Sequence, residues 1–377
     1  MTTVLRGITW EHARGYGSVV AAAEAYRTIR PDVEIAWEFR SLQAFADHPI
    51  EQLVERYDLL VIDHPHVPAA AERGLFAQLD SVGHDDELVT LAGQSVGRSH
   101  ESYRHLGHQW GLATDAAAQV SAYRPDLIEE PPRDWPAVLE LAREGRVLWP
   151  GKPIDAFSSL VTVSANAGAS PMNGDGTFLP EEDALAALAL LHELAAHVPA
   201  ENLAMNPIQV ADALANGSEF AYSPLLFGYT NYSREGFRAS RLRYIDIPSG
   251  PRGVTGSLLG GAGIAVSART GSPAEAIDHA FWLASAPVQA GAYFDGGGQP
   301  GNSVAWEGDS TNAATLDFFR GTRATLEGAY LRPRFAGYIE LQDSLSPLVT
   351  QALAGELTDE QCVRRMNDLT TRLTEGH

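Results

Sequence analysis

Two groups of histidines are the first residues of the sequence whose spacing could support chemistry. His64 and His66 flank Pro65 directly after an apolar run, and a second group comprises His100, His105 and His108. Neither group has the spacing of a HExxH or Cys/His zinc site. We therefore expect no metal and no cofactor. Loops at the carboxyl ends of parallel strands bind ligands in α/β folds, so we expect His64 to contact one.

Nucleophile and nucleotide motifs are absent from the sequence. Ser257 lies in GSLLG, which lacks the GxSxG spacing of a nucleophile elbow. The glycines at 260–263 do not form GxGxxG, and the single lysine, Lys152, is not part of a phosphate-binding loop. The single cysteine, Cys362, excludes an intrachain disulfide. We predict no catalytic residue and interpret the glycines as points where a ligand approaches the backbone closely.

The charge balance excludes two classes of partner. The 377 residues include 48 acidic and 27 basic side chains, which gives a formal net charge of -21. Nucleic-acid binding and docking on an anionic membrane both depend on clustered Lys and Arg. No run approaches the ~20 apolar residues of a membrane span. We therefore expect neither nucleic acid nor membrane as a partner.

The elements that must position these residues follow an alternating pattern. In the first 80 residues the sequence predicts strands at Val4–Thr9, Val33–Phe39 and Asp58–Ile62, with helices at Ser18–Ile29 and Ile50–Tyr57. This order is typical of a parallel sheet with helices on its faces. Further helices are expected at Trp135–Glu144, Asp183–His197, Pro273–Ser285 and Leu357–Leu373. Further strands are expected at Gln119–Tyr123, Arg146–Trp149, Phe220–Tyr222, Arg243–Ile247 and Ile264–Val266, and a flexible run at Asp295–Gly301.

Several motifs occur in a fixed order along the chain. They are YDLLVID at Tyr57–Asp63 with GLFAQLD at Gly74–Asp80, the segment Gly111–Glu144, NGSEFAY at Asn216–Tyr222, the return segment Ile247–Ser267, and AFWLA at Ala280–Ala284. In this order they resemble the motifs of the extracellular solute-binding proteins of ABC importers, family 1, the sugar-binding group similar to maltose-binding protein. The resemblance extends from Val4 to Leu373.

The resemblance implies an α/β, two-lobed periplasmic-binding-protein-like fold of type II, each lobe a mainly parallel sheet flanked by helices. We expect an N-terminal lobe of residues 1–112 and 268–322 and a C-terminal lobe of 113–267 and 323–377. Crossings between the lobes would lie near Gly111–Asp115, Val266–Ser272 and Gly321–Leu331. A ligand in the cleft between them would close the lobes by a hinge motion.

The resemblance and the aromatic and polar loop ends together predict the ligand contacts. They are Trp10, Glu11, His12, Arg14, Tyr16 and His64 from the first lobe, and Trp149, Asp155, Tyr222 and Ser223 from the second, with backbone contacts from Gly260, Gly261 and Gly298. Aromatic faces stack on sugar rings, and polar groups bond their hydroxyls. Alternatively, Glu11 and Arg14 could pair with each other at the surface, and Asp155 could cap a helix.

The expected ligand is a sugar, a polyol or a sugar-like compound. A small acid held by Arg14, His12 and His64 is the alternative. The resemblance implies the membrane subunits of an ABC importer as partners, a monomer, and a periplasmic or cell-surface location. The first residues show no signal peptide, and a native start at Met1 would instead imply the cytoplasm. Such a protein could sense or convert its ligand, with Glu11, His12, Asp63 or His64 as acid–base groups.

Overall fold

The chain divides into two compact units, and each is described by itself. The computed structural model describes residues 2–41, 50–172 and 176–374. The first unit comprises Met1–Ala117, Tyr229–Asn231 and Gly260–Ala313, and the second comprises Ala118–Gly228, Tyr232–Leu259 and Ala314–His377. The chain therefore passes between the units at several points.

The boundaries of the units differ from the expected lobes in ways that strand pairing explains. Residues 314–322 were expected in the N-terminal lobe, but the structure places them in the second unit. Residues 113–117 and 260–267 were expected in the C-terminal lobe, but the structure places them in the first unit. There, β11 (Gly263–Val266) pairs with both β3 (Leu59–Ile62) and β6 (Leu112–Ala113). The sequence did not predict the short segment Tyr229–Asn231, which also belongs to the first unit.

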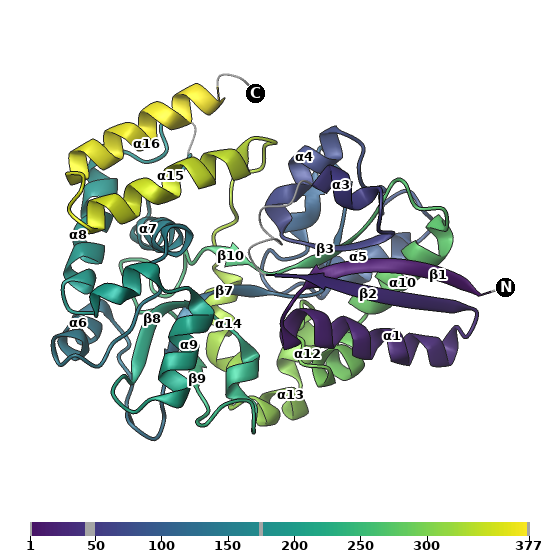
Figure 1. Cartoon of the computed structure of the whole chain (residues 1–377), viewed down its shortest axis with the longest axis horizontal. Coiled ribbons are helices and arrows are strands. Elements are labelled where there is room, and N and C mark those ends of the chain that lie inside the picture. The colour runs from purple at the N-terminus through teal and green to yellow at the C-terminus, as the bar shows by residue number, and fades with distance from the viewer. Residues whose placement is uncertain (1, 42–49, 173–175, 375–377) are drawn as a thin grey trace. The chain divides into compact units, whose positions relative to one another are not determined.

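The first unit contains a five-stranded sheet in the order β2-β1-β3-β11-β6. Strand β1 (Thr3–Trp10) pairs in parallel with both β2 (Val33–Arg40) and β3, as the sequence predicts. Strand β11 is antiparallel to its neighbours because it belongs to the returning chain. Figure 1 shows β1 and β2 side by side with α1 (Ser18–Ile29) running along them.

Both faces of this sheet are buried, which explains the unbroken apolar run in β3. Leu59 and Val61 belong to a hydrophobic cluster with α1 and α10 (Pro273–Ala284), whereas Leu60 and Ile62 belong to a cluster with α3 (Ile50–Val54) and α4 (Val67–Glu72). Successive side chains of a strand point to opposite faces, so a strand covered on both sides has no polar alternation. The remaining elements are α5 (Asp85–Gly93), the hairpin β4 (Arg104–His105) and β5 (His108–Gln109), α11 (Ala286–Val288), α12 (Ser303–Glu307) and α13 (Asp309–Ala314).

The sheet of the second unit is built around β7 (Ala117–Tyr123). Its pairs with β8 (Tyr222–Phe227) and β9 (Arg243–Ile245) are antiparallel, and β10 (Leu259–Gly260) also joins it. The prediction of a mainly parallel sheet is therefore wrong for these pairs. Every residue of β7 is buried, so the strand lacks the exposed alternate positions by which an antiparallel strand is usually recognised.

Helices supply most of the core of the second unit. Helix α7 (Pro153–Ala167) packs against α8 (Glu181–Ala195) and α15 (Tyr338–Leu353), and α15 packs against α16 (Asp359–Thr374), as Figure 1 shows. The sequence suggested a helix beginning near Asp155 but did not predict the extent of α7, because its buried positions run from Asp155 to Asn166 without an exposed polar face. The other helices of this unit are α6 (Trp135–Arg143), α9 (Pro207–Asn216) and α14 (Phe318–Glu327).

Two local predictions are corrected. The expected strand at Arg146–Trp149 is reduced to a single bridge between Val147 and Tyr222. The expected flexible run at Asp295–Gly301 includes Gln299, which is buried and hydrogen-bonded to two other segments of the first unit. In the part of the chain that is described, no helix has the length and apolar character needed to cross a membrane.

Candidate functional site

A buried ion pair lies at the edge of the first unit where the chain leaves it. The guanidinium of Arg14 donates from Nε to Oδ2 of Asp115 at 2.7 Å and from Nη2 to Oδ1 at 2.5 Å. The side chains are only 5% and 0% exposed. This fork-to-fork geometry fixes both groups in orientation as well as in distance.

The turn after β1 positions Arg14. Residues Ala13–Gly17 form a π-helical turn that continues directly into α1. Nδ1 of His12 accepts a hydrogen bond from the backbone N–H of Arg14 at 3.0 Å. The hydroxyl of Ser18 donates to the carbonyl of Arg14, so the turn is closed from both ends.

The pair determines the charge state of Arg14. Burial alone would lower the pKa of Arg14, but the charge and hydrogen bonds of Asp115 outweigh it and raise that pKa above its usual value. Burial also raises the pKa of the Asp115 carboxyl, and the guanidinium opposes that rise. The positive charge of Arg14 is therefore compensated within the protein.

Two further segments of the first unit, which contain Tyr229 and Gln299, lie close to the ion pair between Arg14 and Asp115. The Arg14 guanidinium carbon lies 4.5 Å from the centroid of the Tyr229 ring, and the His12 ring meets Tyr229 edge-on at 5.1 Å. We call His12, Arg14, Asp115 and Tyr229 the Arg14 cluster. Gln299 connects its neighbours, because its side chain accepts from the N–H of Thr230 and donates to the carbonyl of Ala116.

The predicted glycines serve packing at this edge. Gly261 has a φ of +108°, and a Cβ there would lie 2.4 Å from the carbonyl oxygen of Asp115. A Cβ at Gly298 would lie 2.4 Å from the ring of Tyr293. Both positions require glycine for reasons internal to the first unit. Gly260 is half-buried at the end of β10.

The other contacts predicted from the first unit are dispersed. Trp10 is buried in the hydrophobic cluster under the sheet, and Tyr16 is half-buried with its ring edge-on to Phe39. Glu11 is exposed and does not pair with Arg14, so the surface pair considered from the sequence is not formed. His64 is 3% exposed and follows Asp63, whose carboxylate accepts from the His64 N–H.

The histidines at 100–108 occupy structural positions. His105 and His108 face the carboxylates of Glu72 and Asp80. His100 is buried, and burial lowers its pKa to about 4. Across residues 2–41, 50–172 and 176–374, no group of three or more His, Cys, Asp and Glu side chains is placed to hold a metal ion.

In the second unit, Trp149 and Tyr222 belong to the core. Both are fully buried, and their polar atoms are satisfied by hydroxyls of the same unit. The indole N–H of Trp149 donates to Ser159 at 3.0 Å, and the hydroxyl of Tyr222 donates to Ser121 at 2.9 Å. Neither ring presents a free face for stacking. Ser223 is also fully buried, and within the described chain its hydroxyl has no hydrogen-bond partner.

Asp155 differs from Trp149 and Tyr222 because one oxygen of its buried carboxyl is not satisfied within the described chain. It lies in the first turn of α7 and is 5% exposed, and Oδ2 has no hydrogen-bond partner in the described chain. It does not cap α7, whose N-cap residue is Lys152. Burial raises the pKa of Asp155 to about 8, and the charge of Lys152 opposes this only in part. Such a buried orphan oxygen is rare and is satisfied when a hydroxyl or amide donates to it.

Sequence reasoning missed Asp115 and the contact role of Tyr229. Asp115 lies 101 residues from Arg14, and no periodicity or motif relates positions so far apart. Tyr229 lies in the short excursion of the chain into the first unit, which no local pattern marks.

Comparisons with known proteins agree on one fold. The sequence profile of a family described as bacterial extracellular solute-binding protein matches residues 20–316. Maltose-bound MalE3 of T. maritima is similar in structure, with a TM-score of 0.84, 17% identity, and coverage of 99% of this chain and 100% of that one. No curated protein sequence matches the chain.

Two further solved structures are solute-binding proteins of ABC transporters. One, from Agrobacterium radiobacter K84 in complex with ribitol, has a TM-score of 0.83, 18% identity, and coverage of 98% of each chain. The other, from Thermotoga lettingae bound with α-D-tagatose, has a TM-score of 0.82, 16% identity, and coverage of 99% of this chain and 100% of that one. At these identities the likeness shows the fold, which is the two-lobed periplasmic-binding-protein-like architecture.

The first prediction concerns the buried ion pair. Arg14→Met should lower the free energy of unfolding by about 3–5 kcal/mol, because it leaves the Asp115 carboxyl buried without its counter-charge. In a double-mutant cycle with Asp115→Asn, measured by urea unfolding, we expect a coupling energy of about 1–3 kcal/mol.

The exposed pair between Arg6 and Glu38 in the same unit is the matched control. Its side chains are 47% and 48% exposed, so solvent screens the charges and the cycle of Arg6→Met with Glu38→Gln should show almost no coupling. Equal coupling in the two cycles would contradict the role given to the buried pair.

The second prediction concerns the pH dependence of stability at Asp155. The folded carboxyl ionises near pH 8 and the unfolded one near 3.8, so unfolding releases a proton at the pH values between them. Wild-type stability therefore falls relative to Asp155→Asn as the pH rises from about 4 to about 8. At pH 9 the variant should be more stable, by about 2–5 kcal/mol. Urea unfolding of both proteins from pH 4 to pH 9 tests this, and a constant difference would contradict it.

Proposed function

The chain belongs to the bacterial extracellular solute-binding proteins, and we propose that its solute is an uncharged polyhydroxylated molecule, a sugar or a polyol. The family match confirms the resemblance inferred from the sequence motifs. Proteins of the same fold were solved with maltose, ribitol and α-D-tagatose, which supports this class of solute.

The observation that carries the proposal is the orphan oxygen of Asp155. A buried acceptor without a partner is costly, and a ligand hydroxyl that donates to it removes that cost. Because the pKa of Asp155 is raised to about 8, its carboxyl keeps a proton at neutral pH. A protonated carboxyl both donates and accepts hydrogen bonds, which matches the hydrogen-bonding capacity of a hydroxyl group.

The state of Arg14 favours a neutral solute over a small acid. A small acid was expected to be held by Arg14 together with His12 and His64, in charge-assisted hydrogen bonds. The Arg14 guanidinium instead makes two hydrogen bonds to Asp115 in a buried site. If Arg14 moved to bind a ligand, Asp115 would be left buried without its counter-charge. The free energy of the folded protein would rise as a result.

We propose binding without chemical conversion of the solute. Among the acid–base candidates, Glu11 is exposed and His64 is buried beside the ring of Tyr103. Asp63 uses one carboxylate oxygen to accept from the N–H of His64. The surroundings of Asp63 and His64 support a structural role for these two residues.

The remaining parts of the proposal follow from the family. The protein would act outside the cytoplasm as a monomer and would deliver its solute to the membrane subunits of an ABC importer. Closure on the solute by a hinge motion stays a prediction. Chain crossings at Ala117, Gly228, Asn231, Leu259 and Ala313 are where the backbone would accommodate such a motion.

The third prediction tests the class of solute. In a thermal-shift panel, neutral sugars and polyols such as maltose, ribitol, mannitol and tagatose should include one that raises the unfolding midpoint, because a ligand of the native state stabilises it. Gluconate, glucose 6-phosphate and small dicarboxylates should have no effect. Stabilisation by the acids alone would contradict the proposal.

Calorimetry with the sugar or polyol that stabilises the protein tests the role of Asp155. Asp155→Ala should weaken the binding of the stabilising sugar by about tenfold or more, because one buried hydrogen bond is lost. Ser158→Ala is the matched control on the same helix, since that hydroxyl donates to the carbonyl of Ile154 within α7. Equal affinity of the wild type and Asp155→Ala in calorimetry would remove Asp155 from the site.

A further inference from the structure

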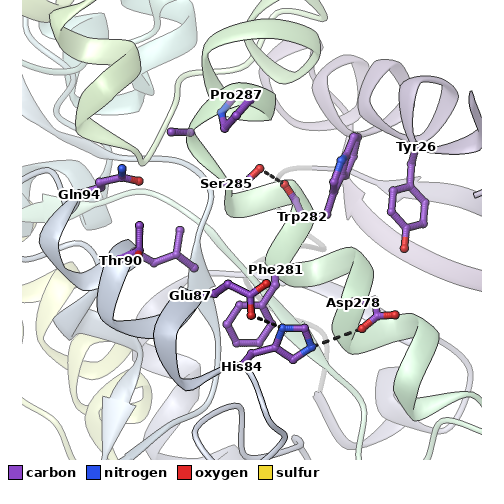
Figure 2. A pocket seen from close by; sticks show the side chains of 12 residues that line it. Tyr26, His84, Glu87, Thr90, Gln94, Asp278, Phe281, Trp282, Ser285 and Pro287 are labelled. Atoms are coloured by element: carbon purple, nitrogen blue, oxygen red, sulfur yellow. Dashed lines mark hydrogen bonds and ion pairs between the residues drawn. The ribbon is translucent and has the colours of Figure 1, made fainter. Parts of the chain in front are cut away.

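The first unit contains a pocket that the proposed solute does not use. It has a volume of about 510 Å³ and lies between α5 and α10, with the chain after α10 at one end. None of the residues predicted to contact the solute lines it. Figure 2 shows Glu87, Thr90 and Gln94 on one side and Asp278, Trp282 and Ser285 on the other.

Helix α5 forms one wall of this pocket and packs only loosely onto the unit, through the half-buried Leu88 and Leu91. The structure describes all of α5, and none of its residues is buried. Val89 is 73% exposed, and Leu91 is half-buried at the pocket wall. The wall that α5 supplies is therefore partly apolar, and the pocket beside it can accept a ligand with an apolar body.

Aromatic rings form much of the opposite wall. Tyr26 and Trp282 lie 4.8 Å apart between ring centroids, and His84 stacks on Phe281 at 4.4 Å with an interplanar angle of 12°. Aromatic faces carry negative potential, which attracts a cation placed over them. The wall therefore suits an apolar body and an attached positive charge.

The ionisable side chains at the pocket include two carboxylates. Glu87 and Asp278 are the carboxylates among the described residues that line it, and neither lysine nor arginine is among them. His84 bridges the carboxylates, at 2.5 Å from Glu87 and 3.3 Å from Asp278 (Figure 2). Arg30 lies 3.2 Å from Asp278 but is shared with Asp32. Each carboxylate has capacity for further donors.

We propose that this pocket binds a small organic cation, an ammonium or guanidinium group carried on an aromatic or aliphatic body. The apolar body lies between α5 and the ring of Trp282, and the cationic group lies near Glu87 and Asp278. A pocket of this size suits a ligand at the small end of the range for protein sites. The site is independent of the solute site, because it is lined by different residues.

Phenethylammonium is the probe, and the uncharged 2-phenylethanol and the anionic 3-phenylpropionate are its matched analogues. Calorimetry on the full chain at pH 7 should give saturable binding of phenethylammonium with a dissociation constant at or below about 1 mM. The neutral analogue should bind about tenfold more weakly, and the anion should not bind. Equal affinity for the three compounds, or no binding of the cation, would overturn the proposal.

Two pairs of variants locate the binding. Thr90→Trp places a large ring in the pocket and should abolish binding, whereas Val89→Trp, on the adjacent exposed position of α5, should retain it. Glu87→Gln combined with Asp278→Asn should weaken phenethylammonium binding by about tenfold and leave 2-phenylethanol unchanged. Glu275→Gln, on α10 but outside the lining, is the control for that change. Unfolding midpoints confirm that each variant is folded.

Binding that persists in Thr90→Trp would place the cation elsewhere and overturn the assignment. The same holds if the carboxylate variants and Glu275→Gln behave alike, because the attraction would then come from the overall acidity of the protein and not from this pocket.

Discussion

The buried contact between Arg14 and Asp115 is the constraint on which the edge of the first unit depends. A charge that is removed from water must be compensated within the protein, and here the compensation joins the turn after β1 to the segment that leaves the unit. Tyr229 lies against the same guanidinium, and Gly261 leaves room for the carbonyl of Asp115. Segments separated by more than a hundred residues are thereby held in one place, next to where the chain crosses to the second unit.

Asp115 and Asp155 both carry buried carboxyl groups, but they differ in whether the protein compensates them. Asp115 has its counter-charge, so its site is complete within the protein. Asp155 has only Lys152 to oppose the effect of burial, and its Oδ2 has no hydrogen-bond partner in the described chain. An uncompensated buried group is costly and is usually kept for a function. This contrast, together with membership of the solute-binding family, supports hydroxyl recognition at Asp155 and argues against anion recognition at Arg14.

Elements with a clear local signal could be predicted from the sequence, and the site mostly could not. Helix α1 has the predicted bounds of Ser18–Ile29, because its apolar spacing and the following Pro31 are local features. Helix α7 was missed because burial on all sides removes the amphipathic pattern. Arg14 was recognised as a functional candidate, but its partner Asp115 depends on tertiary contact alone. Trp149 was expected to contact the ligand because it ends a strand-like segment, although its side chain is fully buried and its indole donates to Ser159.

A crystal structure of the chain with a bound sugar or polyol tests the central claim most directly. The account predicts that the Arg14 guanidinium still makes both hydrogen bonds to Asp115, and that a ligand hydroxyl lies within hydrogen-bond distance of Oδ2 of Asp155. A structure in which Arg14 has left Asp115 to bind an anionic group of the ligand, with Asp155 away from the ligand, would contradict it.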